Sequence, residues 1–199
     1  PKFDVDEWRL RLKIRKEDEV IVIGSSHEPE EKEIVNSLLP LLRKRENLKL
    51  LVVPRHPERF AKVAQFLQTL PLTFSSYTEG IEEASNCILI DTMGVLNRCY
   101  AIADVAIVAG SFSSCVGGHN ILEPLVFGKP TLFGPHMQSQ QDLVELVRGI
   151  AFVRQLSVDE LAQEIETILH TSLEKRREGI TPFLQEIKGA LEKTWKILF

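Results

Sequence analysis

The sequence has few cysteines, and none of them lies in a metal-binding or redox arrangement. Cys87, Cys99 and Cys115 are odd in number and show no CxxC spacing. We therefore expect reduced thiols lying mostly among apolar residues, as in a cytosolic protein, and no structural disulfide. No His and Cys cluster has zinc spacing. The pair Asp4 and Asp6 precedes any predicted strand, so it cannot converge with other ligands on a rigid frame, and we predict no metal site.

Long apolar runs and the common nucleotide motifs are also lacking. No run is long enough to cross a bilayer, and no signal peptide is visible. The chain contains no GxGxxG, no P-loop and no GxSxG elbow. Its net charge of -4 argues against wholesale nucleic-acid binding, so an anionic ligand must be met by local groups. Because the sequence starts with Pro rather than Met, we expect it to be part of a longer protein.

Short β-branched runs alternate with amphipathic segments over all 199 residues. This alternation predicts right-handed crossovers and a mainly parallel sheet with helices on both faces, a Rossmann-like α/β domain spanning residues 1–199. Strands are expected at 20–23, 48–53, 72–76, 87–90, 104–109, 130–133 and 151–153. Helices are expected at 57–70, 95–103 and 140–148, and also from residues 28, 118, 158 and 182.

Local signals predict how several of these helices begin. Glu28, Glu30 and Glu31 are expected in the first turn of one helix, where carboxylates favour the helix dipole. Ser157 and Glu160 form a capping box. Thr181 is expected to cap a helix that restarts after Gly179, with Pro182 in its first position. The segment 182–199 is amphipathic and predicts a terminal helix.

Ligands of such sheets bind beyond the carboxyl ends of the strands, so the loops from Gly24, Pro54, Asp91, Gly110 and Gly134 are the candidate sites. The segment from Ser111 to Glu123 is the most informative of them. Gly117 and Gly118 permit close approach, and a helix opening at Gly118, His119 and Asn120 predicts free amides for a phosphate. Glu123 could accept hydrogen bonds from ribose hydroxyls; the alternative is a glycine turn beside a buried, paired Glu.

The other loops offer weaker signals. Prolines on both sides of Arg55 and His56 stiffen two basic residues for a phosphate, although Arg55 could instead pair with an acid. Arg59 is expected on the surface. Further candidate ligand groups, each of which could equally serve a turn or a cap, lie in the remaining loops: Ser26, His27, Asp91, Met93, Gly94 and His136.

Together, GSSH at Gly24, PRHPER at Pro54, DTMG at Asp91, ADVAIVAGS at Ala103, GGHNILEP at Gly117 and GPH at Gly134 resemble the carboxyl-terminal half of bacterial Kdo transferases. These enzymes add 3-deoxy-D-manno-octulosonic acid (Kdo) to a lipid A precursor. The resemblance covers nearly the whole chain. It implies the donor-binding half of a GT-B glycosyltransferase, in lipopolysaccharide synthesis at the cytoplasmic face of the inner membrane.

The resemblance also implies roles for individual residues. Arg55 and the groups around Gly118, His119 and Asn120 would hold the phosphate of CMP-Kdo, Met93 and Gly94 would border the nucleotide, and Glu123 would bind its ribose. The general base would lie in an amino-terminal acceptor domain, toward which the helix 182–199 would pack. No cofactor or metal is implied beyond the donor substrate. Two departures stand out: Val95 replaces an acid of the family pattern, and the loop 137–141 lacks an expected aromatic residue and Asn.

Two other interpretations remain open at this point. Another GT-B enzyme, a transferase or epimerase that uses a UDP-sugar, would share the fold and Glu123. A non-catalytic nucleotide-binding module would share the fold alone, and its terminal helix with Trp195 and Phe199 could dock a partner.

Overall fold

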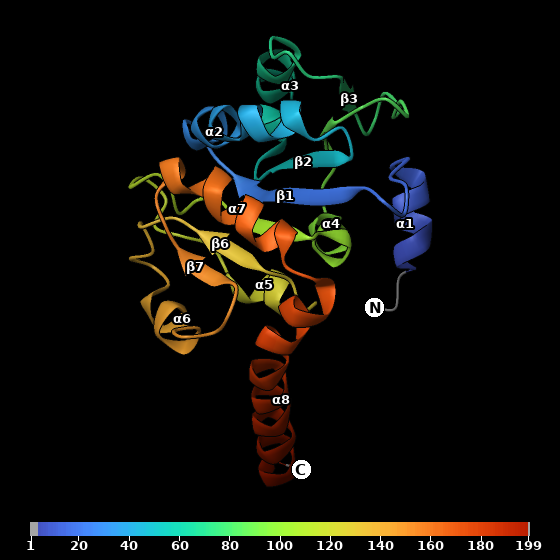
Figure 1. The fold of residues 1–199 in the computed structure, drawn as a ribbon. Helices are drawn as coiled ribbons and strands as arrows, with labels where there is room; N and C mark the ends of the chain where they lie inside the picture. The colour runs from blue at the N-terminus through green and yellow to red at the C-terminus, as the bar shows by residue number, and fades with distance from the viewer. Residues whose placement is uncertain (1–3, 199) are drawn as a thin grey trace.

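Seven parallel strands form one sheet in the order β3-β4-β2-β1-β5-β6-β7 (Figure 1). The computed structural model describes residues 4–198, with side chains to residue 188. The strands are β1 (Glu19–Ser26), β2 (Leu48–Pro54), β3 (Phe74–Ser76), β4 (Cys87–Leu89), β5 (Val105–Val108), β6 (Thr131–Phe133) and β7 (Val153–Gln155). Because β1 pairs with β2 on one side and β5 on the other, the strand order reverses at β1 and β5. This is where parallel sheets of this kind open a crevice for ligands.

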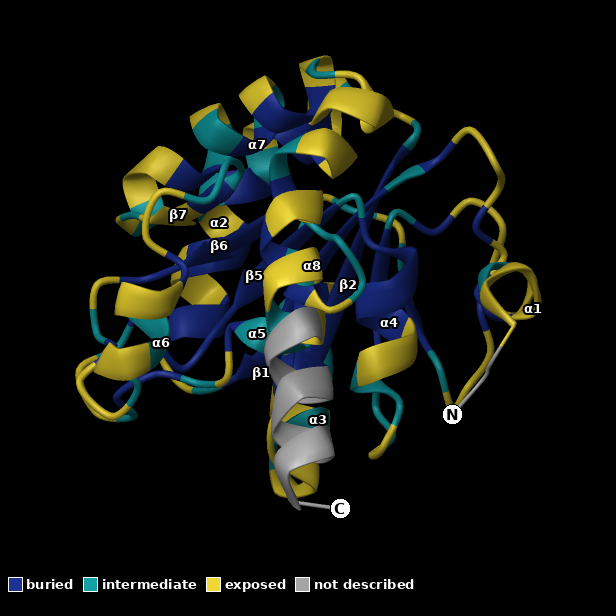
Figure 2. Cartoon of the chain, turned by 90° about the horizontal axis from the view of Figure 1, so that it is seen from below, coloured by how far each residue is buried: buried dark blue, intermediate teal, exposed yellow. Residues whose placement is uncertain are grey.

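Helices cover both faces of the sheet because the central strands are apolar on both faces. Val20 and Val22 of β1 face one core, and Ile21 and Ile23 face the other; all four are fully buried. Figure 2 shows the central strands in the dark blue of buried residues. The core that contains Ile21 and Ile23 is covered by α2 (Glu30–Lys44), α3 (Phe60–Gln68) and α7 (Leu161–His170). The core that contains Val20 and Val22 is covered by α1 (Val5–Arg11), α4 (Leu96–Ile102), α5 (Leu122–Leu125), α6 (Gln141–Leu146) and α8 (Leu173–Leu198). The predicted fold class is confirmed.

Single turns of 3-10 helix precede two of the helices, η1 (Pro57–Arg59) before α3 and η2 (Val158–Glu160) before α7. The predicted capping box at η2 is confirmed, since a Glu160 carboxylate oxygen accepts from the Ser157 N–H at 2.8 Å. The predicted last strand was misplaced: β7 begins at Val153 rather than at residue 151. No helix described between residues 4 and 198 is both long and apolar enough to cross a membrane.

The predicted break before Pro182 was wrong. Helix α8 runs unbroken through Gly179 and Pro182, and Thr181 donates its hydroxyl to the Arg177 carbonyl instead of capping a new helix. Gly179 is small for another reason: a Cβ there would lie 2.8 Å from Ala151 Cβ. Figure 1 shows α8 continuing away from the sheet. Side chains from residue 189 onward, including Trp195 and Phe199, lie outside the described ones.

The cysteine prediction was only partly right. Cys87 and Cys99 are free and buried, whereas Cys115 is free and exposed in the loop after β5. Burial raises the pKa of the Cys87 thiol to about 12, which keeps it protonated and unreactive.

Replacing Gly24 by Ala should destabilise the fold through crowding. A Cβ at Gly24 would meet the Tyr100 hydroxyl oxygen and ring, and Tyr100 is fully buried and cannot move aside. We expect Gly24→Ala to lower the free energy of unfolding by about 3 kcal/mol. Gly128→Ala is the control, since its Cβ has room, with Leu184 at 3.8 Å, and only its left-handed φ of +67° costs about 1 to 2 kcal/mol. Urea unfolding of both variants checks the order, and a smaller loss for Gly24→Ala would contradict the crowding.

Candidate functional site

A cavity of ≈ 370 Å³ opens at the carboxyl ends of β1, β2 and β4. Arg55, Met93, Gly94 and Glu123, four of the residues singled out from the sequence, line it together. They come from the loop after β2, the loop after β4 and helix α5. Ser25, Pro54 and Thr92, which belong to the motifs quoted above, also line the wall; Val53, Leu96 and Asn97 are lining residues that the sequence did not point to. We call this cavity the cleft.

Arg55 is an exposed cation without a bound partner. Among the described residues its guanidinium has no hydrogen bond or ion pair, while its peptide N–H donates to the Ser26 carbonyl at 3.1 Å. The acid pairing considered as the alternative belongs to Arg59 instead, which is bound to Glu28 at 2.6 Å and Glu31 at 2.9 Å. Arg59 is less exposed than expected, with 17% of its side chain accessible. Arg55 is left available to an anionic ligand.

Three imidazoles gather beside Arg55. The Nε2 atoms of His27 and His119 lie 2.8 Å apart, and their rings stack with centroids 5.0 Å apart. The ring of His56 meets that of His27 edge-on at 5.1 Å. His27 follows β1 and His119 follows β5, so this contact bridges the point where the strand order reverses. One nitrogen of the short His27–His119 contact must carry the proton and the other must accept it.

Burial and positive neighbours keep this histidine pair neutral. Burial, together with His119 and His56, lowers the pKa of His27 to about 4. Burial, with Arg55 and His56, also lowers the pKa of His119. Burial raises the pKa of Glu123, and Arg55 works against that rise. Arg55 is therefore close enough to act on both the imidazoles and the carboxylate, as a shared anion site requires.

The loop from Gly117 to Asn120 differs from its prediction. Helix α5 begins only at Leu122 and has four residues, because Gly117 and Gly118 take left-handed φ values of +90° and +97°. The Gly118 N–H is not free either, since it donates to the Gly110 carbonyl at 2.8 Å. The peptide N–H groups of His119 and Asn120 make no hydrogen bond to the described residues. The free amides thus come from a glycine loop rather than from a helix end.

The family departures have structural explanations. Val95 is half-buried and packs against the core beside α4, a position suited to an apolar side chain. In the loop 137–141, Met137 is buried and packs against Gly118, where a Cβ would lie 2.5 Å from its sulfur. The Ser139 N–H donates to the Gly117 carbonyl at 2.9 Å. The loop 137–141 therefore packs against the Gly117–Gly118 turn and stabilises it.

Two of the weaker candidates, Ser26 and Ser111, use their hydroxyls in contacts within the protein, and a third, His136, lies outside the cleft wall. Ser26 is fully buried and its hydroxyl donates to Glu31 at 3.4 Å. Ser111 is fully buried too, donating to the Val108 carbonyl at 2.6 Å and accepting from the Gly134 N–H at 2.7 Å. His136 is half-buried and does not line the cleft; its neighbours Pro135 and Met137 line another cavity. Ser26 and Ser111 therefore hold strand ends in place.

Asp91 and Glu30 also have roles that differ from those expected. Asp91 does not cap α4; it accepts hydrogen bonds from the Thr78 N–H at 2.9 Å and from the Thr78 hydroxyl. Glu28 precedes α2, whereas Glu30 and Glu31 lie in its first turn as predicted and are both buried, at 0% and 2% exposure. Their positions four residues before the buried Ile34 and Val35 put them on the apolar face of α2, a signal that the sequence already contained.

Within residues 4–198 no three His, Cys, Asp or Glu side chains are arranged to share a metal ion.

Acid should destabilise the domain through His27. A histidine whose folded pKa is lowered from 6.5 to about 4 contributes stability that is present above pH 6.5 and lost as pH falls through that window. We expect the free energy of unfolding to fall more steeply from pH 6.5 to 4 in the wild type than in His27→Gln, because groups common to both cancel. Urea unfolding at several pH values measures the difference. Parallel curves would show that His27 is not held neutral.

Comparison with known proteins connects this chain to one enzyme family. No family model matches the chain. Over 196 residues, 96% of the chain, it is 37% identical to a 3-deoxy-D-manno-octulosonic acid transferase of Chlamydophila psittaci, covering 44% of that protein. The chain thus spans about half the length of the curated relatives it matches.

Solved structures agree with this match. The crystal structure of the C-terminal CMP-Kdo binding domain of WaaA from Acinetobacter baumannii superposes with a TM-score of 0.83 at 31% identity, over 91% of this chain and 96% of that one. The C-terminal domain of the glycosyl transferase LpcC from Francisella tularensis shares the fold at 11% identity, with a TM-score of 0.63 over 95% and 93% of the two chains. The fold is that of a GT-B carboxyl-terminal domain, and the chain belongs to the 3-deoxy-D-manno-octulosonic acid transferase family.

Proposed function

We propose that this domain binds CMP-Kdo in the cleft and serves as the donor-binding half of an inverting Kdo transferase. The observation that carries the proposal is the convergence of Arg55, Met93, Gly94 and Glu123 on one cavity from three separate segments. Support comes from the relatives, which are named for this transfer, and from the similar domain of WaaA, which is described as a CMP-Kdo binding domain. The acceptor is then a lipid A precursor, and the full-length enzyme acts at the cytoplasmic face of the inner membrane.

The chemistry follows from Arg55, Met93 and Glu123 in the wall of the cleft and from the loop after β5, whose His119 and Asn120 do not line it. When an acceptor hydroxyl attacks the anomeric carbon, the bond to CMP breaks and the phosphate gains negative charge. Arg55 and the free N–H groups of His119 and Asn120 are donors that can be aimed at that phosphate. Glu123 accepts from the ribose hydroxyls, and the exposed Met93 covers the nucleotide. The general base belongs to an acceptor domain, toward which we propose that the segment 182–199 packs.

A monophosphate leaving group limits what the domain must supply. Fixed cations and peptide donors can stabilise the charge that develops on one phosphate. The proposal therefore invokes no cofactor apart from the donor itself. Because the opposite wall of the cleft and the base are assigned to another domain, we expect this chain alone to bind CMP weakly and to transfer no Kdo. Transfer by this chain alone would overturn that division of labour.

Arg55→Ala should weaken CMP binding by about 10- to 100-fold, since a charge-assisted contact contributes about 1.5 to 3 kcal/mol. Isothermal titration calorimetry of the wild type against CMP and UDP tests the donor class first. Arg43→Ala, an exposed arginine on α2, is the matched control and should bind CMP like the wild type. In the full-length enzyme we expect Arg55→Ala to lower kcat by about 10²- to 10³-fold. Preference for UDP, or normal turnover without Arg55, would contradict the proposal.

Glu123 should distinguish a ribose from a deoxyribose. If its carboxylate accepts from ribose hydroxyls, the wild type binds CMP more tightly than 2′-deoxy-CMP, by about 10-fold for one charge-assisted hydrogen bond. Glu123→Ala should reduce that ratio toward one, because it removes the acceptor. Competition calorimetry with both nucleotides measures the ratio. An unchanged ratio in Glu123→Ala would show that Glu123 does not contact that hydroxyl.

A further inference from the structure

Glu30 connects two loops that meet beside the cleft but are far apart in sequence. Its side chain is fully buried at the start of α2. One carboxylate oxygen accepts from the N–H groups of His27 at 2.9 Å and Gly110 at 2.5 Å. The other accepts from the N–H of Phe112 at 3.2 Å. A single carboxylate therefore ties the loop after β1 to the loop after β5.

The peptide groups that Glu30 holds are those that seat the histidine pair. His27 contacts His119 through Nε2 atoms 2.8 Å apart. The ring of His119 lies directly on Gly110, where a Cβ would be 2.4 Å from its Cδ2 atom. The Gly110 carbonyl also accepts from the Gly118 N–H. Because Gly110 is held by Glu30 and itself contacts both the His119 ring and the Gly118 N–H, Glu30 indirectly fixes the positions of both.

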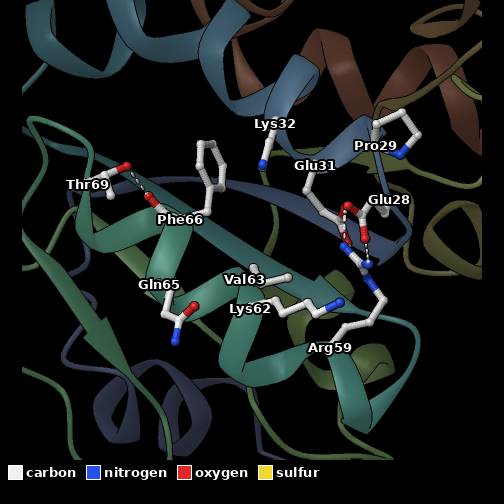
Figure 3. A pocket seen from close by; sticks show the side chains of 10 residues that line it. All are labelled: Glu28, Pro29, Glu31, Lys32, Arg59, Lys62, Val63, Gln65, Phe66 and Thr69. Atoms are coloured by element: carbon white, nitrogen blue, oxygen red, sulfur yellow. Dashed lines mark hydrogen bonds and ion pairs between the residues drawn. The ribbon is translucent and has the colours of Figure 1, made fainter.

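Ion pairing does not explain why Glu30 is buried. The nearby guanidinium of Arg59 is taken by Glu31 and Glu28, as Figure 3 shows. Within the described part of the chain Glu30 has no cationic partner, and burial raises its pKa to about 6 despite three peptide donors. Burying this carboxylate costs solvation free energy. The buried Glu30 carboxylate offsets that cost by accepting from peptide N–H groups that would otherwise have no acceptor.

Glu30 touches no group that lines the cleft, so its influence on a ligand is indirect. Its nearest contact with the ligand-facing groups runs through Gly110 to His119, whose own N–H and that of Asn120 are the free donors. Loosening the loop after β5 would therefore move these donors relative to Arg55. A displacement of about 1 Å at such donors is enough to weaken a preorganised site.

We propose that Glu30 is a positioning residue for the nucleotide site, fixing the loops after β1 and β5 so that His119 and the turn from Gly117 to Asn120 face Arg55. This inference rests on the proposed function and deepens it. It assigns a role in ligand binding to a carboxylate that lies outside the cleft.

The first test uses the unaltered protein. The titratable and charged groups around the Glu30 carboxyl are Glu31 of α2, whose charge is paired with Arg59 of η1, His27 of the first loop and His119 of the second. If the carboxylate holds both loops, NMR amide signals of His27, Gly110 and Phe112 should shift together with a common midpoint near pH 6. Independent midpoints, or no shift in one loop, would overturn the link.

The second test removes the charge. Gln at position 30 keeps the shape but must turn its NH₂ group toward peptide N–H donors. We expect Glu30→Gln to bind CMP about 10-fold more weakly and to shift the imidazole signals of His119. Glu33→Gln removes an equal charge from the exposed side of the same helical turn and should behave like the wild type in both measurements. A folded Glu30→Gln with the CMP affinity and His119 signals of Glu33→Gln would overturn the proposal.

The two proposals fail in different ways. If the wild type binds no CMP, the proposed function fails, whatever Glu30 does. If the wild type binds CMP and Glu30→Gln does so equally well, the function stands and the positioning role fails. Should Glu30→Gln not fold, the shared amide titration of the wild type still decides whether one carboxylate joins the two loops.

Discussion

The pairing of β1 with β5 at the centre of the sheet is the constraint on which the site depends. It brings together two loops that lie more than 80 residues apart in sequence, one carrying His27 and the other carrying Gly110 and His119. Both segments contain backbone in the left-handed region: Ser25, at the end of β1, has a φ of +57°, and the loop after β5 has three glycines with positive φ. The buried carboxylate of Glu30 and the stacked imidazoles supply contacts between them.

The polar groups near the strand ends divide into two sets. The hydroxyls of Ser26 and Ser111, the Gly118 N–H and the Asp91 carboxylate all have partners within the protein. Arg55 and the N–H groups of His119 and Asn120 do not, within the described residues. The internal hydrogen bonds of the first set hold the loops rigid. The donors of the second set can then stay in position for a ligand without bonding to other groups of the protein. The division explains why several polar residues of the family motifs do not face the cleft.

The sequence predicted the sheet and the strand-end loops that contribute Arg55, Met93 and Gly94 to the cleft, because both depend on short-range patterns. Apolar runs of β1, β2 and β5 identify buried strands, and the parallel arrangement then places every strand-end loop on one edge. Patterns of this kind could not show that Gly117 and Gly118 would delay α5, since Asn, Gly and Glu occur in both helix starts and loops. The unbroken α8 was missed because Gly179 reads as a helix end, whereas it accommodates Ala151, a contact between distant segments. Glu30 was missed as a loop anchor because its three acceptor contacts involve peptide groups, which leave no sequence signature.

The electrostatics of the domain require that an anion be recognised at short range. A chain with a net charge of -4 does not attract a nucleotide from a distance, and salt screens charges beyond about 8 to 10 Å. The histidine pair adds no permanent charge near neutral pH, because burial lowers the pKa of both rings. Arg55 is then the fixed cation at the cleft, held between two prolines and free of carboxylate partners among the described residues. An anion that enters the cleft would meet one cation, on a backbone restricted by prolines, with neutral donors in the neighbouring loop, so we expect the positions of these groups to matter more for binding than the total charge does.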